Sequence, residues 1–197
     1  PSRHWYLSVC DDWTWVDGAS YYVDATTEKY RTHFNMFTYI NEELPRVAAE
    51  HFPVSLRNKS ITGYSMGGHG AIVSQIRTNN SYKSVSAFSP ISNPSQSELC
   101  MKGYGSSLVL LMRKGLGFYP ADCIWQFRPI SLAVDVGTAD PYLHWLHVYE
   151  LIEVAGKAGL KIDFRPRDHY DHSFWQVSTI IQEHIEFHSR FLNAWAE

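Results

Sequence analysis

The chain has 197 residues, of which 45% are hydrophobic, and its 17 Lys and Arg against 20 Asp and Glu give a net charge of −3. This length suits one domain that buries about 70% of the surface of the unfolded chain. No basic cluster is interleaved with aromatic residues, which argues against a nucleic-acid-binding protein. No apolar stretch is long enough to span a bilayer, and no leader-like segment opens the chain, so we expect neither membrane association nor secretion.

The three cysteines, Cys10, Cys100 and Cys123, are odd in number and widely scattered. Scattered cysteines of this kind fit reduced thiols better than a disulfide framework. We therefore expect a cytoplasmic protein.

Short apolar patterns alternate with longer helical patterns along the chain, which predicts a mostly parallel α/β sheet flanked by helices. The predicted strands are residues 5–9, 59–64, 84–89, 131–136 and 161–165. The predicted helices are residues 32–51, 66–78, 145–158 and 174–195. Pro45 lies inside the first of these helices and is expected to kink it. No repeat or linker interrupts the series, so residues 1–197 are expected to form a single domain.

The most informative motif is Gly63–Gly67, which reads GYSMG and fits the pattern G-x-S-x-G. A serine at this spacing can occupy a sharp strand-to-helix turn. The flanking glycines are expected to relieve crowding at a bend that often needs positive φ. Ser65 Oγ would then project from the C-terminal edge of the sheet, where the N-terminus of the next helix favours negative charge. The alternative is a buried serine that only forms the turn and has no catalytic role.

Two further side chains complete a Ser–Asp–His order along the chain, each at the end of a predicted strand. Asp140 follows the strand at residues 131–136, and His172 follows the strand at residues 161–165. A serine hydroxyl needs a base that takes its proton, and the base needs an acid that fixes its tautomer. Asp171 and His169 are the competing acid and base, and an Asx turn before Pro141 is the alternative role for Asp140.

Several segments resemble the S-formylglutathione hydrolase family, also called esterase D. They are residues 63–71, 82–94 and 170–174, together with residues 21–26 and 42–45, and the similarity covers roughly residues 18–98 and 130–195. The resemblance implies an α/β-hydrolase fold and a cofactor-free, cytosolic serine thioesterase that hydrolyses S-formylglutathione to formate and glutathione in formaldehyde detoxification. It further implies Ser65 as nucleophile, Asp140 as acid, His172 as base and the Met66 backbone N–H as an oxyanion donor. The implied partner is a small-molecule substrate, and no metal is implied. Whether the chain forms a homodimer is left open.

The chain departs from the family pattern in two places. Family members carry several strands before the region that matches from about residue 18, including a loop that supplies a second oxyanion N–H, so we expect an N-terminally truncated fold. Residues 99–129 diverge from the family. Two alternatives to the thioesterase therefore stay open: a general carboxylesterase on the same scaffold, and a truncated relative without catalytic activity.

Residues 184–188 read HIEFH and place two histidines four apart on the last predicted helix. The glutamate does not follow the first histidine as in H-E-x-x-H, and no third ligand is evident, so no zinc site is predicted. We expect a solvated helix face.

Overall fold

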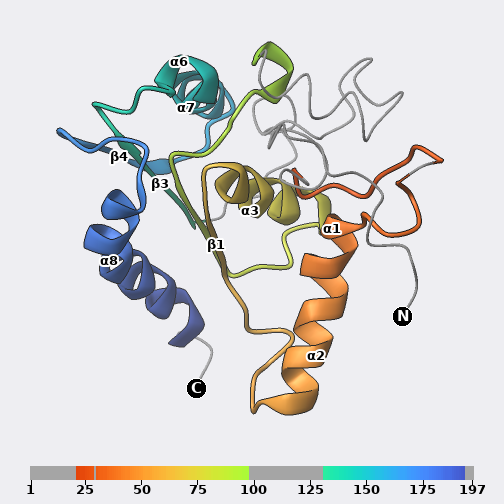
Figure 1. The fold of residues 1–197 in the computed structure, drawn as a ribbon. Helices are drawn as coiled ribbons and strands as arrows, with labels where there is room; N and C mark the ends of the chain where they lie inside the picture. Colours follow the sequence, from red (N-terminus) through yellow and green to blue (C-terminus); the bar gives the residue numbers. More distant parts are fainter. Residues whose placement is uncertain (1–20, 29, 98–130, 194–197) are drawn as a thin grey trace.

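The computed structural model describes residues 21–28, 30–97 and 131–193, which are coloured in Figure 1. The strand expected at residues 5–9, the divergent segment 99–129, the three cysteines and the end of the last predicted helix lie outside these residues. The single-domain organisation of residues 1–197 stays a prediction.

Four parallel strands form one sheet in the order β1-β2-β3-β4. The strands are β1 (Ile61–Tyr64), β2 (Ser84–Phe88), β3 (Ser131–Gly137) and β4 (Ile162–Arg167). Each lies within two residues of its predicted bounds, so the parallel α/β sheet is confirmed. Because all neighbours are parallel, their carboxyl ends meet at one edge of the sheet.

The described part of the chain also contains helices and shorter helical turns. They are α1 (Met36–Thr38), a π-helical segment η2 (Tyr39–Glu43), α2 (Leu44–His51), α3 (Met66–Arg77), the 3₁₀ turn η3 (Pro94–Gln96), α6 (Leu143–Leu146), α7 (Val148–Lys157) and α8 (Phe174–Asn193). None of the helices in the described part of the chain combines the length and the apolar character that crossing a membrane requires.

Two of the predicted helices differ from the observed ones. The helix expected at residues 32–51 begins at Met36, and η2 lies just before Pro45. Pro45 has no N–H to donate to the carbonyl of Asn41, and a wider π turn accommodates that missing bond. The helix expected at residues 145–158 is broken at His147, whose φ is +52°, so α6 and α7 are separate.

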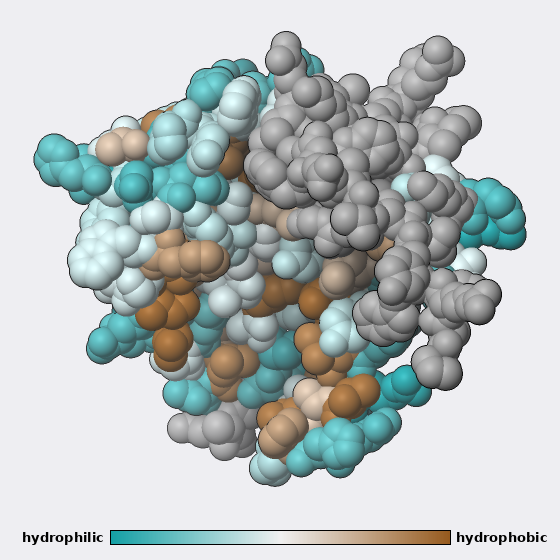
Figure 2. Space-filling model, viewed as in Figure 1, coloured by the Kyte–Doolittle hydropathy of each residue, from teal (hydrophilic) through white to brown (hydrophobic). Residues whose placement is uncertain are grey.

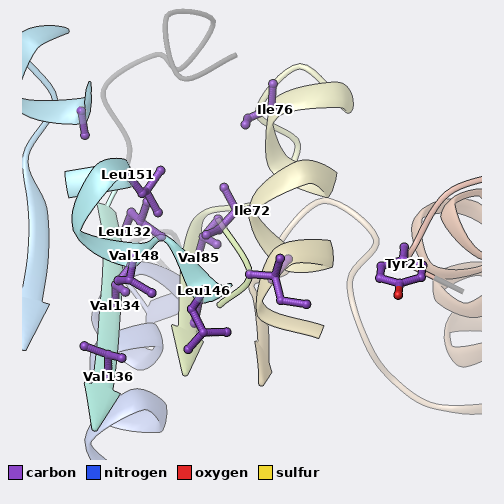
Figure 3. Close-up of a cluster of buried hydrophobic side chains, with 14 of the residues drawn as sticks. Tyr21, Ile72, Ile76, Val85, Leu132, Val134, Val136, Leu146, Val148 and Leu151 are labelled. Carbon is purple, nitrogen blue, oxygen red and sulfur yellow. The ribbon is translucent and has the colours of Figure 1, made fainter. Parts of the chain in front are cut away.

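One face of the sheet carries the apolar core. Val85 of β2 and Val134 of β3 are fully buried and belong to a cluster with Ile72 of α3 and Leu151 of α7. Figure 3 shows the core side chains of β2 and β3 together with those of α3 and α7. Because side chains alternate along a strand, the residues between these positions face the other side.

That other side of the sheet is polar, and α8 covers it (Figure 1). The polar side chains that project there come from all four strands: Thr62, Ser84, Ser86, Asp135, Arg165 and Arg167. Ser84, Ser86 and Asp135 are fully buried. A buried polar face of this kind needs hydrogen-bonding partners on the covering helix.

Apolar side chains also reach the surface around α2 and the loop that follows it. They are Leu44, Val47, Phe52, Val54 and Leu56, with exposed fractions between 42% and 64%. Brown side chains at the lower part of Figure 2 lie over this region.

Candidate active site

Ser65 lies at a sharp turn between β1 and α3, as the sequence predicts. Its φ is 55° and its ψ is −116°, a backbone conformation that is unfavourable for a residue with a Cβ. The Ser65 N–H donates to the carbonyl of Phe88 at 2.8 Å, and the Ser65 carbonyl accepts from His69 at 3.1 Å and from Ile91 at 3.3 Å. Backbone strain persists where neighbouring bonds fix the conformation, and such positions concentrate at functional sites.

The two motif glycines contribute differently from the expectation. A Cβ on Gly63 would lie 2.1 Å from the Gly67 carbonyl oxygen, so the expected crowding is found there. The nearest atoms to a Cβ on Gly67 would all belong to the Tyr22 side chain, at 3.4 Å or more, which is ordinary contact. The positive φ falls on Ser65 itself, whereas Gly159 is the one described glycine with positive φ. The expectation of a crowded bend at Gly67 is therefore wrong.

The structure brings Ser65, His172 and Asp140 into one hydrogen-bonded chain. His172 Nε2 lies 2.9 Å from Ser65 Oγ, and His172 Nδ1 lies 2.6 Å from Asp140 Oδ2. Asp140 follows β3 and His172 lies between β4 and α8, so all three side chains come from the carboxyl edge of the sheet. The Asp140 side chain has no exposed surface, and that of His172 is 12% exposed. This geometry suits a hydroxyl, a base and an orienting carboxylate.

The competing acid Asp171 has another side-chain partner, and the competing base His169 is exposed. Asp171 Oδ1 accepts a hydrogen bond from the Ser173 hydroxyl at 2.5 Å, and the His169 backbone N–H donates to Thr138 Oγ1. The Asx-turn alternative for Asp140 holds alongside its contact with His172, because Asp140 Oδ1 accepts the Tyr142 N–H at 2.8 Å. One carboxylate thus holds its own loop and the imidazole at once.

Two aromatic rings pack on His172 and a third packs on one of them, and sequence reasoning missed all three. The ring of Tyr64 lies 4.9 Å from the imidazole centroid, and that of Tyr142 lies edge-on at 5.1 Å. Phe174 packs on Tyr64 at 5.2 Å. Burial, followed by the negative charges of Asp140 and Asp171, raises the pKa of Tyr64 to about 12, so its phenol stays neutral around neutral pH. Each ring lies within two residues of Ser65, Asp140 or His172, a local signal that could have found them.

Met66 is the first residue of α3. The first N–H groups of a helix have no acceptor within the helix, and the helix dipole favours negative charge at this end. The Met66 N–H therefore suits the oxyanion role that the resemblance implies. Within the described ranges, no group of three or more His, Cys, Asp or Glu side chains could hold a metal ion.

The expectation of a solvated face for the HIEFH segment is wrong. His184 is fully buried and His188 is 9% exposed. His184 Nε2 lies 2.8 Å from Asp135 Oδ2, and both histidines lie 2.8 Å from Ser86 Oγ. The helix positions 176, 180, 184 and 188 form one stripe, and the polar face of the sheet supplies the partners that let histidines lie in it.

The sequence profile of the putative-esterase family matches residues 8–187. The chain belongs to this esterase family. It is 33% identical to the S-formylglutathione hydrolase of Bos taurus and 34% identical to that of Mus musculus, over 189 residues in each case. The structure of an S-formylglutathione hydrolase from Agrobacterium tumefaciens is similar with a TM-score of 0.83 and 30% identity, and the similarity covers 89% of this chain.

These comparisons confirm the resemblance to S-formylglutathione hydrolases and the α/β-hydrolase fold. They identify a chain of the serine-hydrolase type, because the esterase-family relatives are hydrolases by name. The similarity covers 93% of this chain and 67% of the bovine and murine relatives, but 64% of the Agrobacterium chain.

Proposed function

We propose that this esterase-family chain is a serine thioesterase that hydrolyses S-formylglutathione to formate and glutathione. The observation that carries the proposal is the continuous hydrogen-bonded chain from Ser65 through His172 to Asp140 at the carboxyl edge of the sheet. The names of its relatives support this substrate. In this proposal the partner is a small thioester, no cofactor takes part, and the setting is formaldehyde detoxification in the cytoplasm.

In the first step, His172 Nε2 accepts the proton of Ser65 Oγ while the oxygen attacks the formyl carbonyl carbon. The 2.9 Å separation lets this transfer occur directly, and general base catalysis of this kind contributes about 10²–10⁴-fold. Asp140, at 2.6 Å from Nδ1, holds the ring in the tautomer that leaves Nε2 free to accept, and it stabilises the imidazolium that forms.

The attack places a negative charge on the former carbonyl oxygen. The Met66 N–H and the N-terminus of α3 stabilise this charge, and loss of one such donor typically costs about 10²–10³-fold in rate. The C–S bond then breaks, and His172 protonates the departing glutathione thiolate. Water, deprotonated by His172, attacks the formyl-serine ester, which releases formate and restores the Ser65 hydroxyl.

The test measures turnover of S-formylglutathione and of nitrophenyl acetate by the wild type and by Ser65→Ala. We expect the wild type to hydrolyse both and Ser65→Ala to hydrolyse neither. Ser178→Ala, an exposed serine on α8, is the matched control and should retain wild-type rates. Labelling with a fluorophosphonate probe should require both Ser65 and His172.

Other outcomes would each overturn the proposal. Turnover of esters without turnover of the thioester would identify a general carboxylesterase. A folded chain that neither reacts with the probe nor hydrolyses either substrate would be a relative without catalytic activity. Wild-type turnover by Ser65→Ala would exclude Ser65 as the nucleophile.

A further inference from the structure

Helix α8 attaches to the sheet mainly through polar groups, which is unusual for a helix that packs on a buried sheet face. We call these contacts the polar seam. It consists of Gln176, His184 and His188 of α8 with Ser84, Ser86, Ser89 and Asp135 from the sheet and its carboxyl edge. The three α8 side chains are between 0% and 9% exposed. Ile180 and Phe187 are the other buried residues of the helix.

The lower part of the seam is an alternating chain of hydroxyl and imidazole groups. His188 Nδ1 lies 2.7 Å from Ser84 Oγ and its Nε2 lies 2.8 Å from Ser86 Oγ. His184 continues the chain from Ser86 to Asp135, and its ring stacks on Phe88 with centroids 3.7 Å apart. Each of the hydrogen bonds in this chain is directional, unlike an apolar contact.

The middle of the seam joins the two strands that precede the proposed acid and base. Asp135 of β3 lies beside Arg165 of β4 in the sheet, and both Arg165 and Arg167 pair with its carboxylate. Arg167 also reaches Glu183 of α8, with Nη2 and Oε2 2.5 Å apart. The carboxyl ends of β3 and β4 are thereby tied to each other and to the helix.

The upper end of the seam lies next to the nucleophile. Ser89 Oγ donates to Gln176 Oε1 at 3.0 Å, the one hydrogen bond of that side chain among the described residues. Phe88, which precedes Ser89, accepts the Ser65 N–H, and the Ser89 N–H donates to the carbonyl of Asp135. Gln176 lies in the first turn of α8, four residues after His172. This turn is therefore bonded to the same strand end that holds Ser65.

From this geometry we propose that Gln176 and His184 are positioning residues, which fix the register of α8 on β2 and so hold His172 within hydrogen-bonding reach of Ser65. Gln176 and His188 lie 12 positions apart, so the seam extends over about 18 Å of helix. A slip by one residue moves the helix by about 1.5 Å and misaligns all of these bonds together. Apolar contacts over the same length would tolerate such a slip more readily.

The consequence for the reaction rests on the function proposed above. A misplacement of about 1 Å at the reacting groups can lower a rate by about 10²-fold. Loss of the seam is therefore expected to lower kcat. KM should change little, because the seam residues act on the position of His172 and not on substrate binding.

The test uses Gln176→Met, which keeps the length of the side chain and removes the acceptor for Ser89. Gln182→Met is the matched control, because Gln182 is exposed on the same helix and bonds only to Glu186 at 2.9 Å among the described side chains. We expect Gln176→Met to lower kcat for nitrophenyl acetate by about tenfold or more with KM within twofold, and Gln182→Met to match the wild type. Assays run well below the melting temperature of each variant.

A second measurement does not depend on turnover. In crystal structures, the distance from Ser65 Oγ to His172 Nε2 is expected to exceed 3.5 Å in Gln176→Met and to stay near the wild-type value in Gln182→Met. His184→Phe, which keeps the stacking on Phe88 and removes both hydrogen bonds, should lengthen it as well. The inference is overturned if Gln176→Met keeps this distance, or if it keeps wild-type kcat and only melts at a lower temperature. If the wild type lacks turnover, the proposed function fails while the distances still decide this inference.

Discussion

Asp140 and His172 lie 32 positions apart in the chain, yet their Oδ2 and Nδ1 atoms lie 2.6 Å apart. The second carboxylate oxygen accepts the Tyr142 N–H, so the orientation of Asp140 is fixed on both sides. A carboxylate held in this way can keep the imidazole in one tautomer without moving during the reaction.

Asp140→Asn is therefore expected to lower kcat by about 10⁴-fold with little change in KM, because an amide can donate to Nδ1 and favour the wrong tautomer. The measurement is steady-state hydrolysis of nitrophenyl acetate. Asp171→Asn is the control, since Asp171 bonds to Ser173 and lies on the surface, and its kcat should stay within a few-fold of the wild type. The reverse ranking of the two variants would make Asp171 the functional acid.

Gly63→Ala is expected to destabilise the fold, because its Cβ would lie 2.1 Å from the Gly67 carbonyl oxygen and both groups belong to the backbone. Overpacking of this kind costs about 1–3 kcal/mol. Gly156→Ala in α7 is the matched control, because a Cβ there meets nothing within 4 Å. Its helical position predicts a gain of about 0.5–1 kcal/mol. Urea unfolding of both variants gives the comparison, and a stable, fully active Gly63→Ala would contradict the elbow geometry.

Gly137→Ala should lower activity through the loop that carries His172. Gly137 ends β3, and a Cβ there would lie 2.1 Å from the carbonyl oxygen of Tyr170. That carbonyl accepts the Ala139 N–H at 3.0 Å. Displacing it therefore disturbs both the backbone before Asp140 and the backbone before His172. We expect kcat to fall by about 10²-fold. Wild-type kcat in a folded Gly137→Ala protein would show that the loop can shift without moving the imidazole.

The stability of the wild type is expected to decrease as pH falls from about 6.5 to about 4. Burial, with a further contribution from His184, lowers the pKa of His188 to about 4, whereas an unfolded histidine titrates near 6.5. Between these values the unfolded chain binds a proton that the folded chain does not, so the free energy of unfolding falls by about 1.4 kcal/mol per pH unit for this group. Above pH 6.5 this contribution is fully present.

The measurement is urea unfolding at several pH values for the wild type and for His188→Gln. The variant should lose the part of the slope that His188 contributes between pH 4 and 6.5. His51→Gln is the control, because His51 is exposed in the last turn of α2, and its slope should match that of the wild type. Equal slopes for the wild type and His188→Gln would exclude His188 as a source of the pH dependence of stability.

Local patterns in the sequence determined the series of strands and helices, the turn at Ser65, and the order of the candidate nucleophile, acid and base. These features depend on hydrophobic periodicity and on glycine and serine spacing, which act over a few residues. The positions of Asp140 and His172 could also be predicted, because the carboxyl ends of parallel strands lie at one edge of a sheet. The likeness of the segments around them to a known family pointed to the same residues.

Only the tertiary structure decided which side chains meet across the sheet. The two histidines of α8 look like surface residues in the sequence, because the pattern of that helix does not reveal that the facing sheet is polar. Their burial depends on Ser84, Ser86 and Asp135, which lie 49 to 104 positions away. A buried imidazole is stable only where such partners satisfy its nitrogens, and that condition is set by the packing of the whole sheet against the helix.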